Sequence, residues 1–339
     1  MERSLEIQLT VHGIKLEQAY EGQLFAVKKW PDIPAGKPVP DCVQFDYKVS
    51  VKADPSVCEQ QYINRIVPRE VDLFLQSLSL LLRRPSQLIV YKAKLDGVAA
   101  EPKVQQYAPN LYNLAEMLNR GKFTPSGLST CPSRDFWGLL ENTISSYRQR
   151  TDDVSRRVTL ALRWFKKGSD ELNSSDRLVA FWISFNALYE DPLYSQQKSI
   201  ANYIELVDSV MAQRYVTDNM TLLKALSGFP IELRQGKKAT KPVAKELACL
   251  LSAGQLDYAA VAGKAALVIY GIRNKLFHGE YDPDSEDHQK PIATAEDLLS
   301  SLVRELIVKE MTEKPLPATK NVLTQYFERP EMQIREQTW

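Results

Sequence analysis

Alternating apolar and polar positions predict strands in the first part of the chain. In residues 4–12 and again in residues 43–51, every second side chain is apolar, which is the period of a strand with one buried face. Residues 86–95 predict a third strand. The proline-rich segment at residues 31–40 lacks the backbone donors of a central strand, so it is expected to be an exposed loop between the first two.

A helix is expected between the second and third strands. Pro68 suits a first helical turn, and the apolar spacing after it predicts a buried helix that ends near Arg84. A shorter helix is predicted at residues 110–120. Together these elements predict a small α+β domain over residues 1–121, whose role is not apparent from its residues.

The pattern changes after a stretch rich in Gly, Pro, Ser and Thr. This composition is typical of a junction between domains, so we place a linker at residues 122–135. Strand patterns disappear beyond it, and helical spacing predicts an all-α helical bundle over residues 136–312. Residues 313–339, with two early prolines and mixed polarity, are expected to be a C-terminal tail.

The first helices of the predicted bundle have a clear apolar side. Residues 136–167 predict one long or broken helix, and Ser174 or Ser175 is expected to cap the next one. The aromatic and aliphatic residues of that next helix recur at helical spacing, which indicates a core-facing side and not a platform for stacked bases. The residues on this side are Leu178, Phe181, Trp182, Phe185, Leu188 and Tyr189.

A lysine-rich loop is expected after further helices at residues 199–215 and 220–226. Lys237, Lys238 and Lys241 lie close together in this loop. They predict either a phosphate-binding loop for RNA or an ordinary solvated loop, since runs of charge are usually exposed.

The strongest helical pattern of the chain covers residues 257–281. Its apolar residues recur at three- and four-residue steps, so one side of a helix about five turns long is expected to face a core. Gly279 supplies the left-handed residue that commonly ends a helix. The last two turns carry polar residues where the negative end of the helix dipole favours cations, namely Arg273, Asn274, Lys275 and His278.

Composition indicates a soluble globular protein. The 339 residues are 44% hydrophobic, which suffices for two buried cores, and no apolar run is long enough for a membrane span. The N-terminus alternates instead of placing basic residues before an apolar block, so we expect a cytoplasmic protein. The 43 Lys and Arg residues nearly balance the 42 Asp and Glu residues, so affinity for nucleic acid must come from local patches.

Several kinds of chemistry lack their sequence patterns. The four cysteines have no paired spacing, which argues against a zinc knuckle or a disulfide framework. The loop at residues 281–288 gathers carboxylates and His288 but lacks the glycine of a calcium loop. No phosphate loop, dinucleotide fingerprint, nucleophile elbow or HExxH pair occurs in the sequence, so we expect no metal and no cofactor.

The polar residues at the end of the strongest helix have the spacing of a site divided between two helices. Asn274 and His278 are four apart and share a face, whereas Arg273 lies roughly 140° around the helix from His278. One helix therefore cannot close both groups on one small ligand. A groove between two such helices could place both groups on one ligand.

The string RNKLFH at residues 273–278 resembles the signature of the HEPN superfamily of helical-bundle ribonucleases: an arginine, a polar residue after it, and a histidine a few residues on. Residues 157–190 also resemble the first two helices of that bundle, and the resemblance covers residues 136–312. It departs at Asn186, where relatives often carry a glutamate.

This resemblance implies a metal-independent endoribonuclease that leaves a 2′,3′-cyclic phosphate and a 5′-hydroxyl. In that reaction His278 transfers a proton, Arg273 stabilises the charge on the phosphorane, and Asn274 orients the histidine or the phosphate. Lys275 is expected to bind RNA with the three lysines of the loop. The resemblance and the helix angle also imply a homodimer with one shared groove, and relatives often act in toxin or anti-phage systems.

Other interpretations stay open at this point. Arg273 and His278 could simply finish a helix and bind its free carbonyls, and HEPN domains without activity exist, so the chain could be an RNA- or protein-binding scaffold. Some family members carry a modified tyrosine two residues after the histidine, where this chain has Glu280 followed by Tyr281. The N-terminal domain could sense a regulatory partner or restrain the nuclease.

Overall fold

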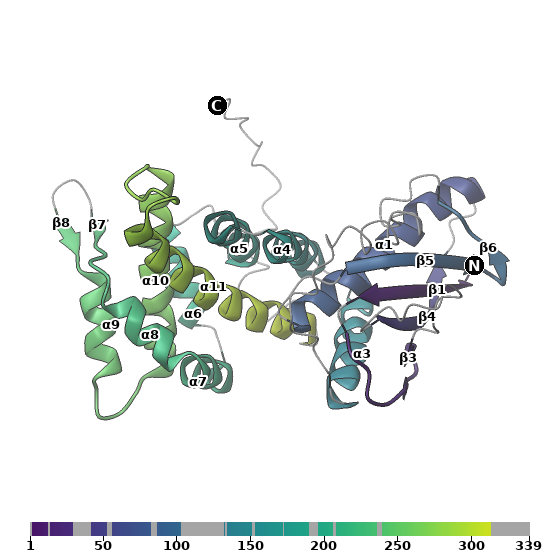
Figure 1. Cartoon of the computed structure of the whole chain (residues 1–339), viewed down its shortest axis with the longest axis horizontal. Helices are drawn as coiled ribbons and strands as arrows, with labels where there is room; N and C mark the ends of the chain where they lie inside the picture. The colour runs from purple at the N-terminus through teal and green to yellow at the C-terminus, as the bar shows by residue number, and fades with distance from the viewer. Residues whose placement is uncertain are drawn as a thin grey trace.

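The computed structural model describes residues 2–312, with gaps at residues 13, 30–41, 53–55, 83–86, 103–131, 133, 151–152, 172, 190–195, 206–207 and 236–238. An antiparallel sheet with its own helices occupies one end of the molecule, and the remaining helices occupy the other (Figure 1). This arrangement confirms a sheet-containing first part followed by a mainly helical second part. The predicted helix at residues 110–120 and the predicted tail lie outside the described residues.

The sheet has six strands in the order β2-β3-β4-β1-β5-β6, and all neighbours are antiparallel. The three predicted strands are present as β1 (Glu2–His12), β4 (Cys42–Lys52) and β5 (Gln87–Leu95). In the central strand β1, Ile7 lies opposite Tyr47 of β4 and Ala93 of β5. Three strands too short to show alternation in the sequence extend the edges, namely β2 (Tyr20–Glu21), β3 (Phe25–Lys29) and β6 (Val98–Ala99).

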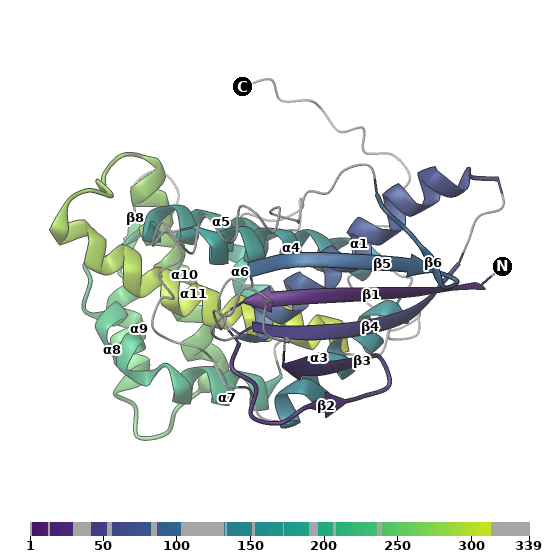
Figure 2. The same cartoon turned by 45° about the vertical axis from the view of Figure 1, so that its right-hand side comes forward.

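Helix α1 (Glu59–Leu82) connects β4 to β5 and covers one face of the sheet, as Figure 2 shows. Phe74 packs against Phe45 of β4, with ring centroids 4.9 Å apart. The helix begins well before Pro68, so the prediction that this proline opens the helix is wrong. Proline removes one backbone donor and its ring crowds the preceding turn, but the long apolar side of α1 is buried against the sheet, which outweighs that cost.

Helix α3 (Arg134–Arg148) covers the same face. Trp137, Leu140 and Ile144 are almost fully buried in one core with the strands, and the Trp137 ring lies 5.7 Å from that of Phe45. Most of the predicted linker at residues 122–135 lies outside the described residues. The helix after it nevertheless belongs to the core of the sheet, so this core extends to Ile144, beyond the predicted boundary.

The second part is a bundle in which α10 packs against α5, α6, α7, α8, α9 and α11, while α4 packs against α5 and α11. Asn173 caps α5 by accepting a hydrogen bond from the Ser175 backbone N–H at 2.9 Å, so the prediction of a serine cap is wrong by one position; asparagine serves equally well there. The apolar side predicted for this helix is buried. The helices are α4 (Asp153–Asp170), α5 (Ser174–Tyr189), α6 (Gln196–Glu205), α7 (Ser209–Asp218), α8 (Met220–Ser227), α9 (Val243–Leu251), α10 (Tyr258–Phe277) and α11 (Glu286–Thr312).

A short hairpin interrupts these helices. β7 (Leu233–Gln235) pairs with β8 (Ala239–Lys241) within the stretch predicted as a loop, so the second part is not purely helical. Ile231, just before β7, approaches α10 so closely that a Cβ on Gly271 would meet the Ile231 Cγ2 at 2.3 Å. Glycine is therefore required at this point of α10, shortly before the polar helix end.

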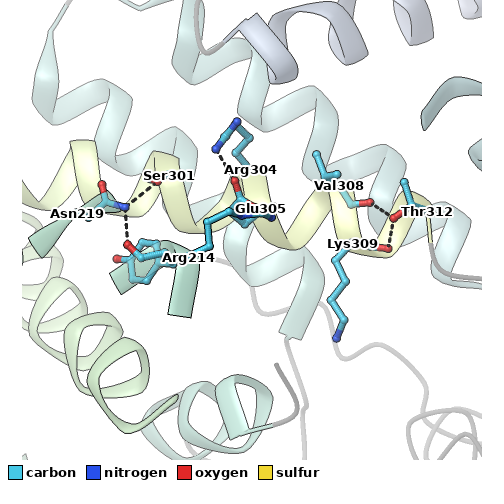
Figure 3. A network of polar contacts seen from close by, with 9 residues as sticks. Arg214, Asn219, Ser301, Arg304, Glu305, Val308, Lys309 and Thr312 are labelled. Carbon is cyan, nitrogen blue, oxygen red and sulfur yellow. Dashed lines mark hydrogen bonds and ion pairs between the residues drawn. The ribbon is translucent and has the colours of Figure 1, made fainter. Parts of the chain in front are cut away.

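Helix α11 joins the two parts of the molecule. On its polar side, Glu305 accepts hydrogen bonds from Arg214 of α7 and from its neighbour Arg304 (Figure 3). The Ser301 hydroxyl accepts from the Asn219 amide at 3.1 Å. Near its C-terminus, Val308 packs against the apolar cores of both parts. In the part of the chain that the structure describes, no helix has the length and apolarity to cross a membrane.

A buried carboxyl on α11 is expected to make stability depend on pH. Glu296 is 4% exposed and accepts a hydrogen bond from the Arg177 Nε at 3.1 Å. Burial raises the pKa of Glu296 from its ordinary 4.5 to about 7, although the Arg177 charge opposes the shift. At a pH between 4.5 and about 7, Glu296 is protonated in the folded state and ionised in the unfolded chain. The free energy of unfolding therefore falls as the pH rises through this range.

We expect Glu296→Gln to remove this part of the pH dependence, which is on the order of 2 kcal/mol. The amide keeps an acceptor for Arg177 and does not titrate. Urea unfolding at about pH 5 and about pH 8 measures the difference. Glu286→Gln, at an exposed position of the same helix, is the control. Equal pH dependence of wild type and Glu296→Gln would show that another group is responsible.

Candidate active site

Backbone hydrogen bonds close the C-terminal end of α10. Gly279 has a φ of +70°, and its N–H donates to the Leu276 carbonyl at 3.2 Å, while the Glu280 N–H donates to the Lys275 carbonyl at 2.8 Å. This pair of bonds is a Schellman motif, which confirms the predicted role of Gly279. Because these carbonyls are satisfied by backbone donors, no side chain is needed to cap them.

Arg273 is a half-buried cation with no carboxylate partner among the described residues. Its guanidinium carbon lies 4.0 Å from the centre of the Phe277 ring, and its Nη1 donates to the Asn274 Oδ1 at 3.0 Å. Its Nε is buried and makes no hydrogen bond. Burial lowers the pKa of Arg273, an effect that Tyr270 and Tyr189 oppose; a guanidinium nevertheless stays charged. A buried, unsatisfied donor on a cation is costly, and a bound anion would remove that cost.

The side chain of Asn274 is oriented by Arg273. A guanidinium can only donate, so the amide oxygen of Asn274 faces it and the amide nitrogen points elsewhere. His278 lies about one turn further along the same face of the helix, and its backbone N–H donates to the Asn274 carbonyl at 2.9 Å. The Asn274 amide nitrogen has no hydrogen-bond partner among the described residues and can donate to a ligand bound beside it.

His278 is the exposed member of the predicted cluster. Together with Phe277, which is 52% exposed, it ends the helix at the molecular surface. Among the described residues no hydrogen bond or ion pair joins the side chains of Arg273 and His278. His278 comes five residues after Arg273, so on an ideal helix their side chains leave the axis in directions roughly 140° apart.

Helix α5 supplies polar groups beside the arginine that the sequence pattern assigned to the core alone. The buried Tyr189 hydroxyl donates to the Asn186 Oδ1 at 2.6 Å. The Trp182 ring lies 5.7 Å from that of Tyr270, about one turn before Arg273. The indole N–H of Trp182 is buried and makes no hydrogen bond. The signal that could have found this wall is the polar Asn186 on an otherwise apolar side, one turn before a tyrosine.

Two of the four lysines predicted to bind RNA have carboxylate partners in the structure. The Nζ of Lys275 lies 3.1 Å from a carboxylate oxygen of Glu280, and that of Lys241 lies 3.5 Å from one of Glu246. Such partly exposed pairs contribute little to stability, so a phosphate can replace the carboxylate at small cost. The other two predicted lysines lie outside the described residues: Lys237 and Lys238.

His288 organises the acidic loop that follows α10. Its Nδ1 accepts a hydrogen bond from the Asp282 backbone N–H at 3.0 Å, which requires the tautomer with its proton on Nε2. Its ring stacks on that of Tyr281, with centroids 4.7 Å apart. Tyr281 is partly buried against the core of the bundle, and this burial raises its pKa. Within the described ranges, no group of three or more His, Cys, Asp or Glu is arranged to hold a metal.

The arrangement can bind a phosphate and move a proton. Arg273 offers a fixed positive charge and a free N–H, Asn274 offers an oriented amide, and His278 offers an exposed imidazole. Imidazoles exchange protons near neutral pH, which suits general acid–base catalysis.

Comparison of the chain with models of known protein families, with curated proteins and with solved structures finds no match.

Proposed function

We propose that the protein is a metal-independent endoribonuclease of the HEPN type, acting as a toxin or anti-phage effector. RNA carries its own nucleophile, so cleavage requires proton transfer from the 2′-hydroxyl and stabilisation of the phosphorane, and no metal. Arg273 binds the phosphate, Asn274 orients it, and His278 transfers the proton. Single-stranded or loop RNA is the substrate, because unstacked nucleotides let the 2′-oxygen move in line with the leaving group.

One observation supports this proposal most directly. The Arg273 guanidinium is half-buried, lacks a carboxylate partner among the described residues and has a buried Nε without a hydrogen bond. An arginine that serves the fold alone would pair with a carboxylate or bond to the carbonyls at the helix end. Backbone donors already satisfy those carbonyls. An arginine left in this state fits the planar, bidentate binding of a phosphate.

The proposal includes a two-fold homodimer with a shared groove. Two copies of the α10 end, related by a dyad, would place an arginine and a histidine from each chain around one cleft. A histidine of this cleft can then take the proton of the 2′-hydroxyl, and the leaving 5′-oxygen receives a proton from a histidine or from water. The exposed Phe277 beside His278 provides apolar surface for such a contact.

The test is cleavage of labelled RNA by the purified chain in the presence of EDTA. We expect cleavage to continue when metal is removed, because the proposed reaction uses side chains alone. Mass analysis should find fragments with 2′,3′-cyclic phosphate and 5′-hydroxyl ends. Fragments with 5′-phosphate, or complete loss of cleavage in EDTA, would exclude the mechanism. Binding of RNA without cleavage would favour an RNA-binding module.

A further inference from the structure

A polar cavity lies where the two parts of the molecule meet. It has a volume of about 760 Å³ and is lined by β4, α1, α3 and α4, which converge between the sheet and the bundle (Figure 1). Cavities of roughly 300–1,000 Å³ hold small ligands. The candidate active site lies beyond the opposite end of α11, whose 27 residues span about 40 Å. The cavity is thus a separate site.

The cavity wall is strongly cationic, although the chain as a whole carries a net charge of only +1. Among the described residues that line it, the carboxylates are Glu70 and Asp72, and Glu70 is paired with Arg148. The cationic lining residues are Lys52, Arg65, Arg69, Arg148, Arg150 and Arg163. Such a concentration of one charge inside a concave surface attracts anions.

Three of these arginines have no ion pair within the described residues. Arg65 and Arg69 are exposed and lie one turn apart on α1, and Arg163 comes from α4, which lines the other side of the cavity. Guanidinium groups form bidentate hydrogen bonds with phosphate oxygens. Arginines from two walls can therefore hold a chain of phosphates between them.

A buried amide without a partner lines the same cavity. Gln76 continues the α1 stripe of Arg69, is only 7% exposed, and makes no hydrogen bond to any residue that the structure describes. The polar atoms of this amide are not fully enclosed by protein, so they face the cavity, where a ligand can bind them. An amide provides a donor and an acceptor side by side, which is the pattern that pairs with the edge of adenine. Leu73 and Leu162 add apolar surface for a base.

We infer that this cleft binds a nucleoside polyphosphate. The phosphates lie on Arg65, Arg69 and Arg163, and the base pairs with the Gln76 amide. An RNA strand bound along its backbone would use exposed cations and would have no need of a buried amide. Because α1 belongs to the sheet-bearing part and α4 to the bundle, the ligand bridges the two. Binding of a nucleotide in this cleft requires no ribonuclease activity.

The experiment is calorimetric titration of the full chain with ATP and with inorganic tripolyphosphate, both in EDTA. We expect Arg65→Ala combined with Arg69→Ala to weaken both ligands roughly 10- to 100-fold, as for lost charge-assisted hydrogen bonds. Gln76→Leu should weaken ATP and leave tripolyphosphate unchanged. A merely structural role for the amide would not discriminate between these two ligands.

The matched control removes the same amount of charge from another surface. Lys92 and Lys94 are exposed and alternate with buried residues of β5, so they point away from α1. Lys92→Ala combined with Lys94→Ala should leave both affinities unchanged. Circular dichroism melting establishes that each variant is folded.

Three outcomes would overturn the inference. The first is absence of binding by either ligand at about 1 mM. The second is an equal loss of affinity in the Lys92/Lys94 control, which would mean that only net charge matters. The third is tighter binding of an eight-nucleotide RNA than of ATP, together with loss of that RNA binding in the Arg65/Arg69 variant. This result would mean that the cleft binds RNA.

Discussion

Replacing Arg273 or His278 by alanine is expected to lower RNA cleavage by roughly two to four orders of magnitude, the usual effect of removing a charge clamp or a proton-transfer group. The fold should survive both changes. His278 is exposed, and Arg273 has no carboxylate partner in the described chain whose charge would be left buried. Removing the guanidinium also removes a buried, unsatisfied N–H.

The measurement is single-turnover cleavage of labelled RNA in EDTA, with the melting temperature of each variant determined beside it. Arg134→Ala, an exposed arginine at the start of α3, is the matched control and should retain full activity. Arg273→Lys should recover only part of the rate, because an ammonium cannot hold two phosphate oxygens in one plane. Equal activity of wild type and His278→Ala would exclude a catalytic role for His278 and favour a binding module.

Mixing the two alanine variants tests the shared groove. If each cleft takes groups from both chains, a dimer of one Arg273→Ala chain and one His278→Ala chain keeps one arginine and one histidine in the cleft. Cleavage should then rise well above that of either variant alone. If the mixture stays inactive although mixed dimers have formed, the site does not combine the two chains, and Arg273 must act with another group.

The features that could be predicted from the sequence are those that depend on neighbouring residues. The strands at residues 4–12 and 43–51 follow from alternation along one segment, and the end of α10 follows from Gly279, which alone relieves the strain of a positive φ. Spacing also placed Arg273 and His278 on different sides of one helix. Each of these predictions depends only on residues within a few turns of one helix or within one strand.

The features that could not be predicted depend on distant contacts. Pro68 lies inside α1 because the sheet buries that helix on both sides of the proline, which local preference does not express. β7 and β8 are too short for their alternation to be recognised. The surroundings of Arg273 come from α5, far earlier in the chain, so the unsatisfied Nε became visible only after the helices were placed.

The second large effect concerns stability: Arg148→Ala is expected to lower the free energy of unfolding by about 3–5 kcal/mol. Arg148, at the end of α3, donates through Nη1 to the Glu70 carboxylate of α1 and through Nη2 to the Ser50 carbonyl of β4 at 2.9 Å. Glu70 is 5% exposed, and within the described residues it also accepts a hydrogen bond from the Tyr47 hydroxyl at 3.3 Å. Alanine would leave this carboxylate buried and without its counter-charge.

A double-mutant cycle in urea separates the buried charge from simple loss of packing. Glu70→Gln removes the charge and keeps an acceptor for Tyr47, so the Arg148→Ala, Glu70→Gln double variant should be less destabilised than Arg148→Ala alone. Arg134→Ala, on the same helix without a buried partner, should cost less than about 0.5 kcal/mol. A loss below about 1 kcal/mol in Arg148→Ala would mean that solvent screens the pair as it does on a surface.

This pair also bears on where the first domain ends. Arg148 ties the last turn of α3 to α1 and β4, and Trp137 and Ile144 of the same helix lie in the core of the sheet. If the double-mutant cycle gives a coupling energy of several kcal/mol between Arg148 and Glu70, α3 contributes to the stability of the sheet-bearing part and belongs to that domain. In a chain that begins at residue 136, α3 would then lack the sheet against which it packs. A chain that ends at residue 121 would lack α3 and leave the face of the sheet that α3 covers partly exposed.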